Sequence, residues 1–334
     1  MSASERLDQK KKFDVLALGE CLIDFTPSGR NDLGMILFAC NPGGAPANVL
    51  AMNAKLGGKT AFIGKVGNDE FGKFLRDTMV NAGIDVSGLC MTPDYKTTLA
   101  FVQLNDKGDR SFTFYRKPGA DVMLEFSEVK QELLESCHIF HFGSVSLTDE
   151  PCRSTTLKCA EIAKEKGAII SYDPNYRPPL WKSENEAIRI MKAALPLADI
   201  IKVSEEEMHL LTGEKDLEDG ARKLAGHGAV LVLVTMGPKG AFYMAEDGSG
   251  YLATYDVNTV DTTGAGDAFL GALHYRIAGM SREELKSLPD KRWREIIGFS
   301  NAAGSLTTTA RGAIPAMPDR EQIEKCIKER KLLK

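Results

Sequence analysis

Short runs of apolar and β-branched residues recur along the chain and predict buried β-strands. The first is residues 13–18, which Gly19 closes, and the same signature returns at 61–66, 169–172, 200–203 and 230–235. Between these runs, apolar residues spaced three and four apart predict amphipathic helices at 47–56, 71–82, 155–166 and 218–225. Because strands alternate with helices, we expect an α/β fold with a mostly parallel sheet covered on both faces.

One region breaks this alternation of strands and helices. Residues 97–104 and 110–116 alternate polar and apolar side chains around a polar turn at 105–109, which predicts an antiparallel hairpin. The stretch 25–40 contains proline and glycine, so it is poor helix material and could add strands to the same flap. We therefore expect a small β lid, formed by about 25–40 and 97–118, beside the main sheet.

The rest of the sequence adds no second unit. No internal repeat, low-complexity tract or interdomain linker is visible, so we expect a single domain over 1–334 with residues 1–12 as a flexible polar leader. Seven cysteines without a C-x-x-C pair argue against a disulfide framework and a structural zinc site. The leader has no apolar signal core and the apolar runs are too short to cross a bilayer, so we expect a cytoplasmic protein.

The charge balance bears on the kind of partner. The formal net charge is -4, and no run of like charge exceeds the triplets Lys10 to Lys12 and Glu205 to Glu207. This is too little charge asymmetry to predict a nucleic acid or a membrane surface as partner. A small molecule is the expected ligand.

A glycine turn feeds a helix at Asp261-Thr262-Thr263-Gly264-Ala265-Gly266-Asp267. Glycine lets the backbone fold tightly there, so the amides of Gly264, Ala265 and Gly266 can converge on an anion at the positive end of the helix dipole. Asp267 would then lie where it can accept a proton from an attacking hydroxyl. Taken alone, the segment is equally compatible with Asp267 as a simple helix-capping acid.

A second glycine turn, Asn41-Pro42-Gly43-Gly44-Ala45-Pro46-Ala47-Asn48, also runs into a helix. Small residues such as Gly43 and Gly44 let a ligand approach the backbone, and the carboxamide of Asn48 can both donate to and accept from a sugar diol. Asp24 follows the first strand, where ligand groups of parallel sheets gather. Its alternative is an ordinary loop carboxylate.

Three more polar segments follow predicted strand ends and are candidates for a nucleotide site. They are 173–177, which contains Asn175 and Arg177, 204–207, and 235–240. Ser204 and Glu207 also match the capping-box pattern, which explains that pair without a ligand. Capping and the binding of magnesium-bound water do not exclude each other.

Together these motifs resemble the PfkB (ribokinase-like) carbohydrate kinase family. The resemblance runs from about Phe13 to Pro318, and the segments 19–25, 97–102, 141–144 and 172–181 look most like fructokinases. It implies a three-layer sandwich with a sheet of nine or so strands and a β lid, ATP and Mg²⁺ as cofactors, and transfer of phosphate from ATP to the 6-hydroxyl of D-fructose.

The resemblance also implies roles for individual positions. Asp267 becomes the general base and Gly264, Ala265 and Gly266 the anion hole. The expected substrate-binding residues are Asp24, Gly43, Gly44, Asn48, Arg116 and Arg177. Those expected to border the nucleotide or position hydrated magnesium are Asn175, Ser204, Glu207, Thr235, Gly237, Gly240 and Asn301, although the family usually has asparagine at position 204. A K⁺ site would lie at Asp261, Thr263, Thr307, Ala310, Gly312 and Ala316.

Three other functions remain open from the sequence. A phosphofructokinase-type member would need several basic residues around a sugar phosphate, which Arg110, Arg116 and Lys117 of the hairpin could supply. A 2-keto-3-deoxygluconate kinase would need cationic or phenolic partners for its acidic substrate, and Tyr115 and Arg116 on the hairpin could supply them. A catalytically silent relative that only binds a ligand would not need the intact Asp267. A homodimer through the lid is a further expectation.

Overall fold

The structure, a computed structural model, describes residues 11–104 and 110–333. Its large sheet consists of β1 (Phe13–Leu18), β4 (Thr60–Gly67), β5 (Ile84–Thr92), β8 (Cys137–Gly143), β9 (Ile169–Asp173), β10 (Ile200–Ser204), β11 (Leu231–Thr235), β12 (Ala241–Ala245) and β13 (Gly248–Leu252). The spatial order of these nine strands is β13-β12-β11-β10-β9-β8-β1-β4-β5. Only β12 pairs antiparallel with its two neighbours, so the sheet is mostly parallel, as predicted.

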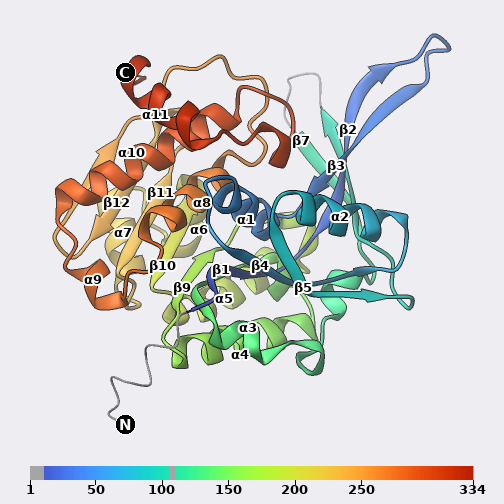
Figure 1. Cartoon of the computed structure of the whole chain (residues 1–334), viewed down its shortest axis with the longest axis horizontal. Coiled ribbons are helices and arrows are strands. Elements are labelled where there is room, and N and C mark those ends of the chain that lie inside the picture. Colours follow the sequence, from blue (N-terminus) through green and yellow to red (C-terminus); the bar gives the residue numbers. More distant parts are fainter. Residues whose placement is uncertain (1–10, 105–109, 334) are drawn as a thin grey trace.

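Helices cover both faces of this sheet (Figure 1). Alternate residues of β1 show the division, because Val15 and Ala17 pack into one apolar core and Leu16 and Leu18 into the other. The first core is covered by α1 (Ala45–Lys55), α2 (Glu70–Asn81), α8 (Ala265–Ile277), α9 (Arg282–Lys286), α10 (Asp290–Thr307) and α11 (Arg320–Glu329). The second is covered by α3 (Gln131–Glu135), α4 (Cys152–Glu165), α5 (Glu184–Ala194), α6 (Glu205–Thr212) and α7 (Leu217–Ala225). The predicted three-layer α/β sandwich is confirmed.

A second, smaller sheet projects from one side of the sandwich (Figure 1). It contains β2 (Leu22–Arg30), β3 (Ile36–Gly43), β6 (Leu99–Leu104) and β7 (Arg110–Tyr115), in the order β3-β2-β6-β7. Phe25 and Phe101 stack across β2 and β6, with ring centroids 4.8 Å apart. Both segments predicted to form extra strands therefore contribute to one sheet. The predicted turn at 105–109 and most of the leader, residues 1–10, lie outside the described residues.

The predicted elements are all present, with shifted ends. The helix predicted from residue 155 begins at Cys152, and the one predicted from residue 47 begins at Ala45. The pattern gave no sign of β13, because its sequence Gly-Ser-Gly-Tyr-Leu lacks an apolar run. That strand lies at the sheet edge and depends on its antiparallel pairing with β12. Within the part of the chain that is described, no helix combines the length and apolar character needed to cross a bilayer.

Candidate active site

The N-terminus of α8 is the centre of the site. Gly264 precedes the helix in a left-handed conformation, with φ 76°, and no side chain caps the first turn. A Cβ at Gly264 would also lie 2.5 Å from the Cβ of Ala313, so only glycine fits this position. The turn thus brings backbone amides to the positive end of α8 and leaves them without a side-chain acceptor, an arrangement that suits an anion.

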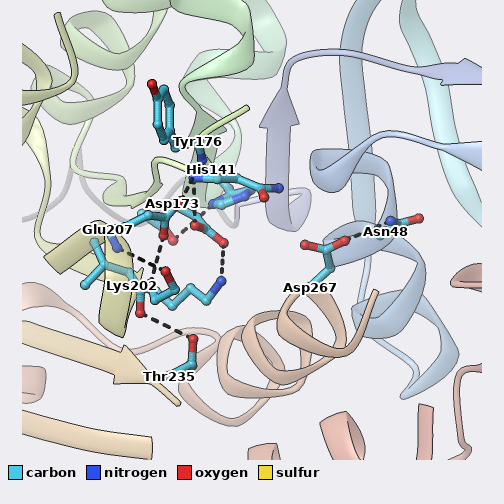
Figure 2. Close-up of polar contacts among 12 residues, drawn as sticks. Asn48, His141, Asp173, Tyr176, Lys202, Glu207, Thr235 and Asp267 are labelled. Carbon is cyan, nitrogen blue, oxygen red and sulfur yellow. Dashed lines mark hydrogen bonds and ion pairs between the residues drawn. The ribbon is translucent and has the colours of Figure 1, made fainter. Parts of the chain in front are cut away.

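Asp267 lies on the first turn of α8 and faces α1 (Figure 2). Asn48 of α1 donates a hydrogen bond from Nδ2 to Oδ2 of Asp267 at 2.8 Å. Burial raises the pKa of the Asp267 carboxyl, an effect that the Asn48 hydrogen bond and the Lys202 charge oppose. The two helices can pack this closely because Gly271 has no side chain. A Cβ at this position would lie 2.4 Å from the Val49 carbonyl oxygen. Asp267 is therefore an oriented carboxylate with one oxygen held by an amide.

Asp267 lines a cavity of 380 Å³ between the two sheets, which we call the Asp267 cavity. Its polar lining residues are Glu20, Asp24, Asn48, Asn175, Arg177, Lys202, Thr262, Thr263 and Asp267. Leu22, Phe114, Val145 and Leu180 add apolar walls, and Gly44, Ala45, Gly264 and Gly266 bring backbone to its surface. The cavity is thus rich in hydrogen-bonding groups, as a site for a small polyol requires.

Asp24, on β2, also lines this cavity. Burial raises the pKa of Asp24 to about 6, while the charge of Arg177 opposes this rise and the charge of Asp267 adds to it. Gly43 does not line the cavity, but a Cβ there would lie 2.2 Å from Oδ2 of Asp24. Gly43 therefore makes room for the Asp24 carboxylate rather than for a ligand.

Glu20 is a buried carboxylate that the sequence did not single out. Its Oε1 accepts a hydrogen bond from the backbone N–H of Ala45 at 3.0 Å, at the start of α1, where Gly44 offers no side-chain cap. Burial raises the pKa of Glu20 to about 7. Glu20 therefore stabilises the turn that leads into α1 and fixes the position of Asn48.

Lys202 is a second residue that sequence reasoning missed. Its Nζ donates to Oδ2 of Asp173 at 2.7 Å, and both side chains are buried (Figure 2). Burial tends to lower the pKa of Lys202, but Asp173 and Glu207 raise it, and the net shift is upward. A Cβ at Gly266 would lie only 3.1 Å from this Nζ, so a buried cation lies directly beside the α8 turn. A lysine within the apolar strand Ile-Ile-Lys-Val-Ser was the available signal.

Ser204 and Glu207 form the predicted capping box at the start of α6. The backbone N–H of Glu207 donates to Oγ of Ser204 at 3.1 Å, and Oε2 of Glu207 accepts from the Ser204 N–H at 2.8 Å. Oε1 of Glu207 also accepts from the Tyr176 N–H at 2.6 Å, and burial raises the pKa of this carboxyl. Neither residue lines a cavity described here, whereas Asn175, with φ 47°, lines the Asp267 cavity.

A second cavity, of 530 Å³, lies on the other side of the α8 turn, and we call it the Phe269 cavity. Four residues predicted to border a nucleotide line it, namely Thr235, Gly237, Gly240 and Asn301. Gly240 has φ 106°, and a Cβ there would lie 2.1 Å from the Leu252 carbonyl oxygen. The Phe269 and Asp267 cavities share Thr262 and Gly266 as lining residues. They therefore meet at the amide-bearing turn.

The structure does not bring Arg116 into either cavity. Arg116 is buried behind the wall, where Nε donates to Asp121 at 2.7 Å, Nη1 to Thr148 at 2.8 Å and Nη2 to the Val145 carbonyl at 3.0 Å. Its guanidinium thus joins the end of β7 to the loop that carries Val145. The expected substrate contact is replaced by a buried ion pair, while Arg177 lines the Asp267 cavity.

The positions predicted for a monovalent cation lie where two loops meet. Oδ1 of Asp261 accepts from the Thr263 N–H and hydroxyl at 2.9 and 2.7 Å, and Oδ2 accepts from the Gly312 N–H at 3.1 Å. Thr307 ends α10, Ala310 lies in the loop that follows, and Ala316 ends the short 3₁₀ helix Ile314–Ala316. Among the described residues no cluster of three or more His, Cys, Asp or Glu side chains is placed to hold a metal ion. An ion here would depend on carbonyl and hydroxyl oxygens.

Known proteins share this architecture. Fructokinase-1 of Oryza sativa subsp. japonica is 46% identical over 315 residues, which cover 93% of this chain and 96% of the relative. The crystal structure of fructokinase with bound ATP from Xylella fastidiosa aligns with a TM-score of 0.88 at 33% identity, over 95% of this chain and 98% of that one. A double mutant of the Vibrio cholerae O395 fructokinase, in a fructose, ADP and potassium ion bound form, aligns with a TM-score of 0.84 at 33% identity, over 96% and 100% of the two chains.

The model of one family matches residues 12–320, nearly the whole chain. That stretch contains both glycine turns, the strand ends and the residues that line the two cavities up to Thr308. With relatives this similar over more than nine-tenths of its length, the chain belongs to the pfkB family of carbohydrate kinases.

Proposed function

We propose that this protein is an ATP-dependent fructokinase, which converts D-fructose and ATP to D-fructose 6-phosphate and ADP. One observation carries the proposal: a polyol-sized cavity and a larger cavity meet at the amide-bearing turn of α8, beside the Asp267 carboxylate. A phosphoryl group passing between two ligands needs this kind of junction. The fructokinase names of the relatives support the choice of sugar.

In this mechanism fructose occupies the Asp267 cavity. Asp24 would accept hydrogen bonds from its hydroxyls, and the carboxamide of Asn48 can both donate to them and accept from them. Gly44 lets the sugar approach the backbone. Asp267 takes the proton of the 6-hydroxyl as the O6–P bond forms and the bond from the γ-phosphorus to the bridging oxygen of ADP breaks. Its raised pKa makes the carboxylate a stronger base than an exposed aspartate, and Asn48 keeps it aimed at the sugar.

The transferred group carries negative charge that must be stabilised between the two cavities. The amides of Gly264, Ala265 and Gly266 would provide the anion hole, supported by the dipole of α8. Lys202 adds a full positive charge beside Gly266, and its ion pair with Asp173 holds it in place. These groups are fixed before the reaction, so little reorganisation is needed as the charge develops.

ATP would occupy the Phe269 cavity, with Thr235, Gly237, Gly240 and Asn301 along its walls. Asn175 and Glu207 would help to position hydrated Mg²⁺. Each Glu207 oxygen accepts one backbone N–H and keeps a lone pair for a metal-bound water. Magnesium, when bound with ATP, neutralises phosphate charge. Ser204 would act indirectly, through the capping box that orients Glu207.

The small sheet would act as a lid within a single kinase domain. Leu22, Asp24 and Phe114 belong to it and line the Asp267 cavity, so its closure over the sugar would exclude water. Leu37 and Phe38 on β3 are exposed apolar residues, a feature that favours the predicted homodimer through the lid, which sedimentation analysis can check. Cytoplasmic residence remains a prediction from the sequence.

We expect K⁺ to raise the activity above that in Na⁺ or a bulky organic cation at equal ionic strength. An ion among the Asp261, Thr263 and Gly312 loops would stabilise the turn that presents the anion-hole amides. Initial rates in the three chloride salts test this. Equal rates in all three would contradict the cation site and leave the kinase assignment intact.

We expect kcat/KM for fructose to fall as the pH is lowered through about 6, the raised pKa of Asp24. Below that pH Asp24 is protonated and loses its charge, so it no longer accepts two charge-assisted hydrogen bonds from the sugar. A pH profile of wild type and Asp24→Asn tests this, because the substitution should lower the plateau and remove that limb. An unchanged limb in Asp24→Asn would assign it to another group.

The substrate is tested by a steady-state panel of fructose and 2-keto-3-deoxygluconate with ATP. Fructose should give the higher kcat/KM, because Asp24 and Asp267 repel an acid in a partly dry cavity. Arg116, the expected partner for a keto acid, is bound to Asp121 and does not line the cavity. Arg177 does line it, so Arg177→Ala is the variant in which to compare the two substrates. A preference for the keto acid would overturn the substrate, and no turnover of either sugar would favour a silent binding protein.

A further inference from the structure

The segment after α11 returns to the Phe269 cavity. Leu332 forms an antiparallel bridge with Tyr255. The N–H of Asp256 donates to the Lys331 carbonyl at 2.8 Å, and the N–H of Leu333 donates to the Thr254 carbonyl at 2.8 Å. Residues 331–333 thus pair with 254–256 around an isolated antiparallel bridge, and we refer to them as the 331–333 segment.

Neighbouring side chains of this segment have different surroundings. Leu333 lines the Phe269 cavity together with Tyr255, Val257 and Phe269. Leu332 is 53% exposed and is not among the residues that line that cavity. Successive side chains of an extended strand point to opposite sides, which explains the difference. The backbone pairing therefore directs only Leu333 toward the cavity.

The polar groups of the same wall are largely engaged within the protein. Nδ2 of Asn301 donates to the carbonyls of Leu252 and Ala253 at 3.1 and 3.2 Å. Oγ of Ser305 donates to the Asn301 carbonyl at 2.7 Å, and Oγ1 of Thr308 donates to the Ser305 carbonyl at 2.7 Å. Because these donors are occupied, a ligand at this wall is held mainly by apolar contact.

We propose that Leu333 is part of the nucleotide site and packs against the nucleobase, while Leu332 does not contribute to it. The proposal rests on the proposed function in taking ATP as the occupant of the Phe269 cavity. The phosphates must lie toward the amide-bearing turn of α8, at the Thr262 and Gly266 end of this cavity. The base then lies away from the turn, and its apolar faces require an apolar cover, which Leu333 supplies together with Val257.

Leu333→Asn and the matched control Leu332→Asn test the proposal. Titration of ADP into each purified variant should show a Kd about fivefold to tenfold higher for Leu333→Asn, because the base then loses the apolar contact with the leucine side chain. Leu332→Asn should bind ADP like wild type. Inorganic tripolyphosphate, which has no base, should bind all three proteins equally, and KM for fructose should not change.

Three results would overturn the proposal. They are an unchanged ADP affinity in Leu333→Asn, an equal loss in Leu332→Asn, and an equal loss of tripolyphosphate binding. The last two would mean that the substitution disturbs the fold around Tyr255 rather than a contact with the base, and thermal melting of both variants reports the same disturbance. If wild type binds neither ADP nor ATP, the proposed function fails instead, and that outcome is separate from any difference between the variants.

Discussion

Asp267→Asn is expected to lower kcat by at least about 10²-fold while the protein stays folded and binds ATP, because asparagine has the same shape but cannot take the proton of the sugar hydroxyl. Asn48 can still hydrogen-bond the side-chain oxygen at position 267, so the geometry between α1 and α8 is retained. Steady-state kinetics with fructose and ATP measure the loss. ADP titration and thermal melting establish that binding and stability are retained.

Asp256→Asn provides the matched control, since this exposed aspartate lines neither cavity. Its kcat should equal that of wild type. Near-normal turnover of Asp267→Asn would remove Asp267 from the role of general base. The alternative left open by the sequence, in which Asp267 only opens the helix, would then stand.

Lys202→Met is expected to reduce the free energy of unfolding by about 3–5 kcal/mol, because it leaves the Asp173 carboxylate buried without its partner. The two side chains are 9% and 3% exposed, so solvent cannot replace the lost ion pair. Urea denaturation measures the loss of stability, and Lys192→Met, at an exposed position on α5, should change stability by no more than about 0.5 kcal/mol.

The double variant Asp173→Asn with Lys202→Met separates two explanations of that loss. If the cost of Lys202→Met comes from the isolated carboxylate, the double variant is more stable than the sum of the two single losses predicts. Additive losses would show that the two residues act independently. The double variant should also have a lower kcat than wild type, because no cation then lies beside Gly266.

The sequence predicts the strands and helix starts, because these depend on residues that are neighbours in the chain. The apolar runs predicted the parallel strands β1, β4, β9, β10 and β11 but not β5 or β8. The two glycine turns predicted helix starts, where Gly44 and Gly264 have positive φ and leave no room for a Cβ. The two turns lie close together because α1 and α8, the helices that they start, pack against each other on one face of the sheet. Family resemblance then added Asn301, which no local pattern marked.

Other parts of the site depend on tertiary contacts that a local pattern does not encode. Arg116 follows β7 like a lid residue, but its environment is set by Asp121 and Thr148, which come from later segments. Leu333 lies 64 positions after Phe269 in the sequence, and the backbone pairing of 331–333 with 254–256 brings it to the same cavity. Lys202 was visible as an anomaly in an apolar strand, yet its partner Asp173 belongs to the neighbouring strand.

The contact between Gly271 and Val49 also constrains how this enzyme can change over evolution. Because a single Cβ would drive α1 and α8 apart, the helices that carry Asn48 and Asp267 cannot shift independently. Variation in substrate preference is therefore expected to accumulate in Leu22 and Phe114 of the small sheet, which line the same cavity but have no part in that contact. One half of the cavity is constrained by its backbone geometry, and we expect the other half to be the part that adapts to a new sugar.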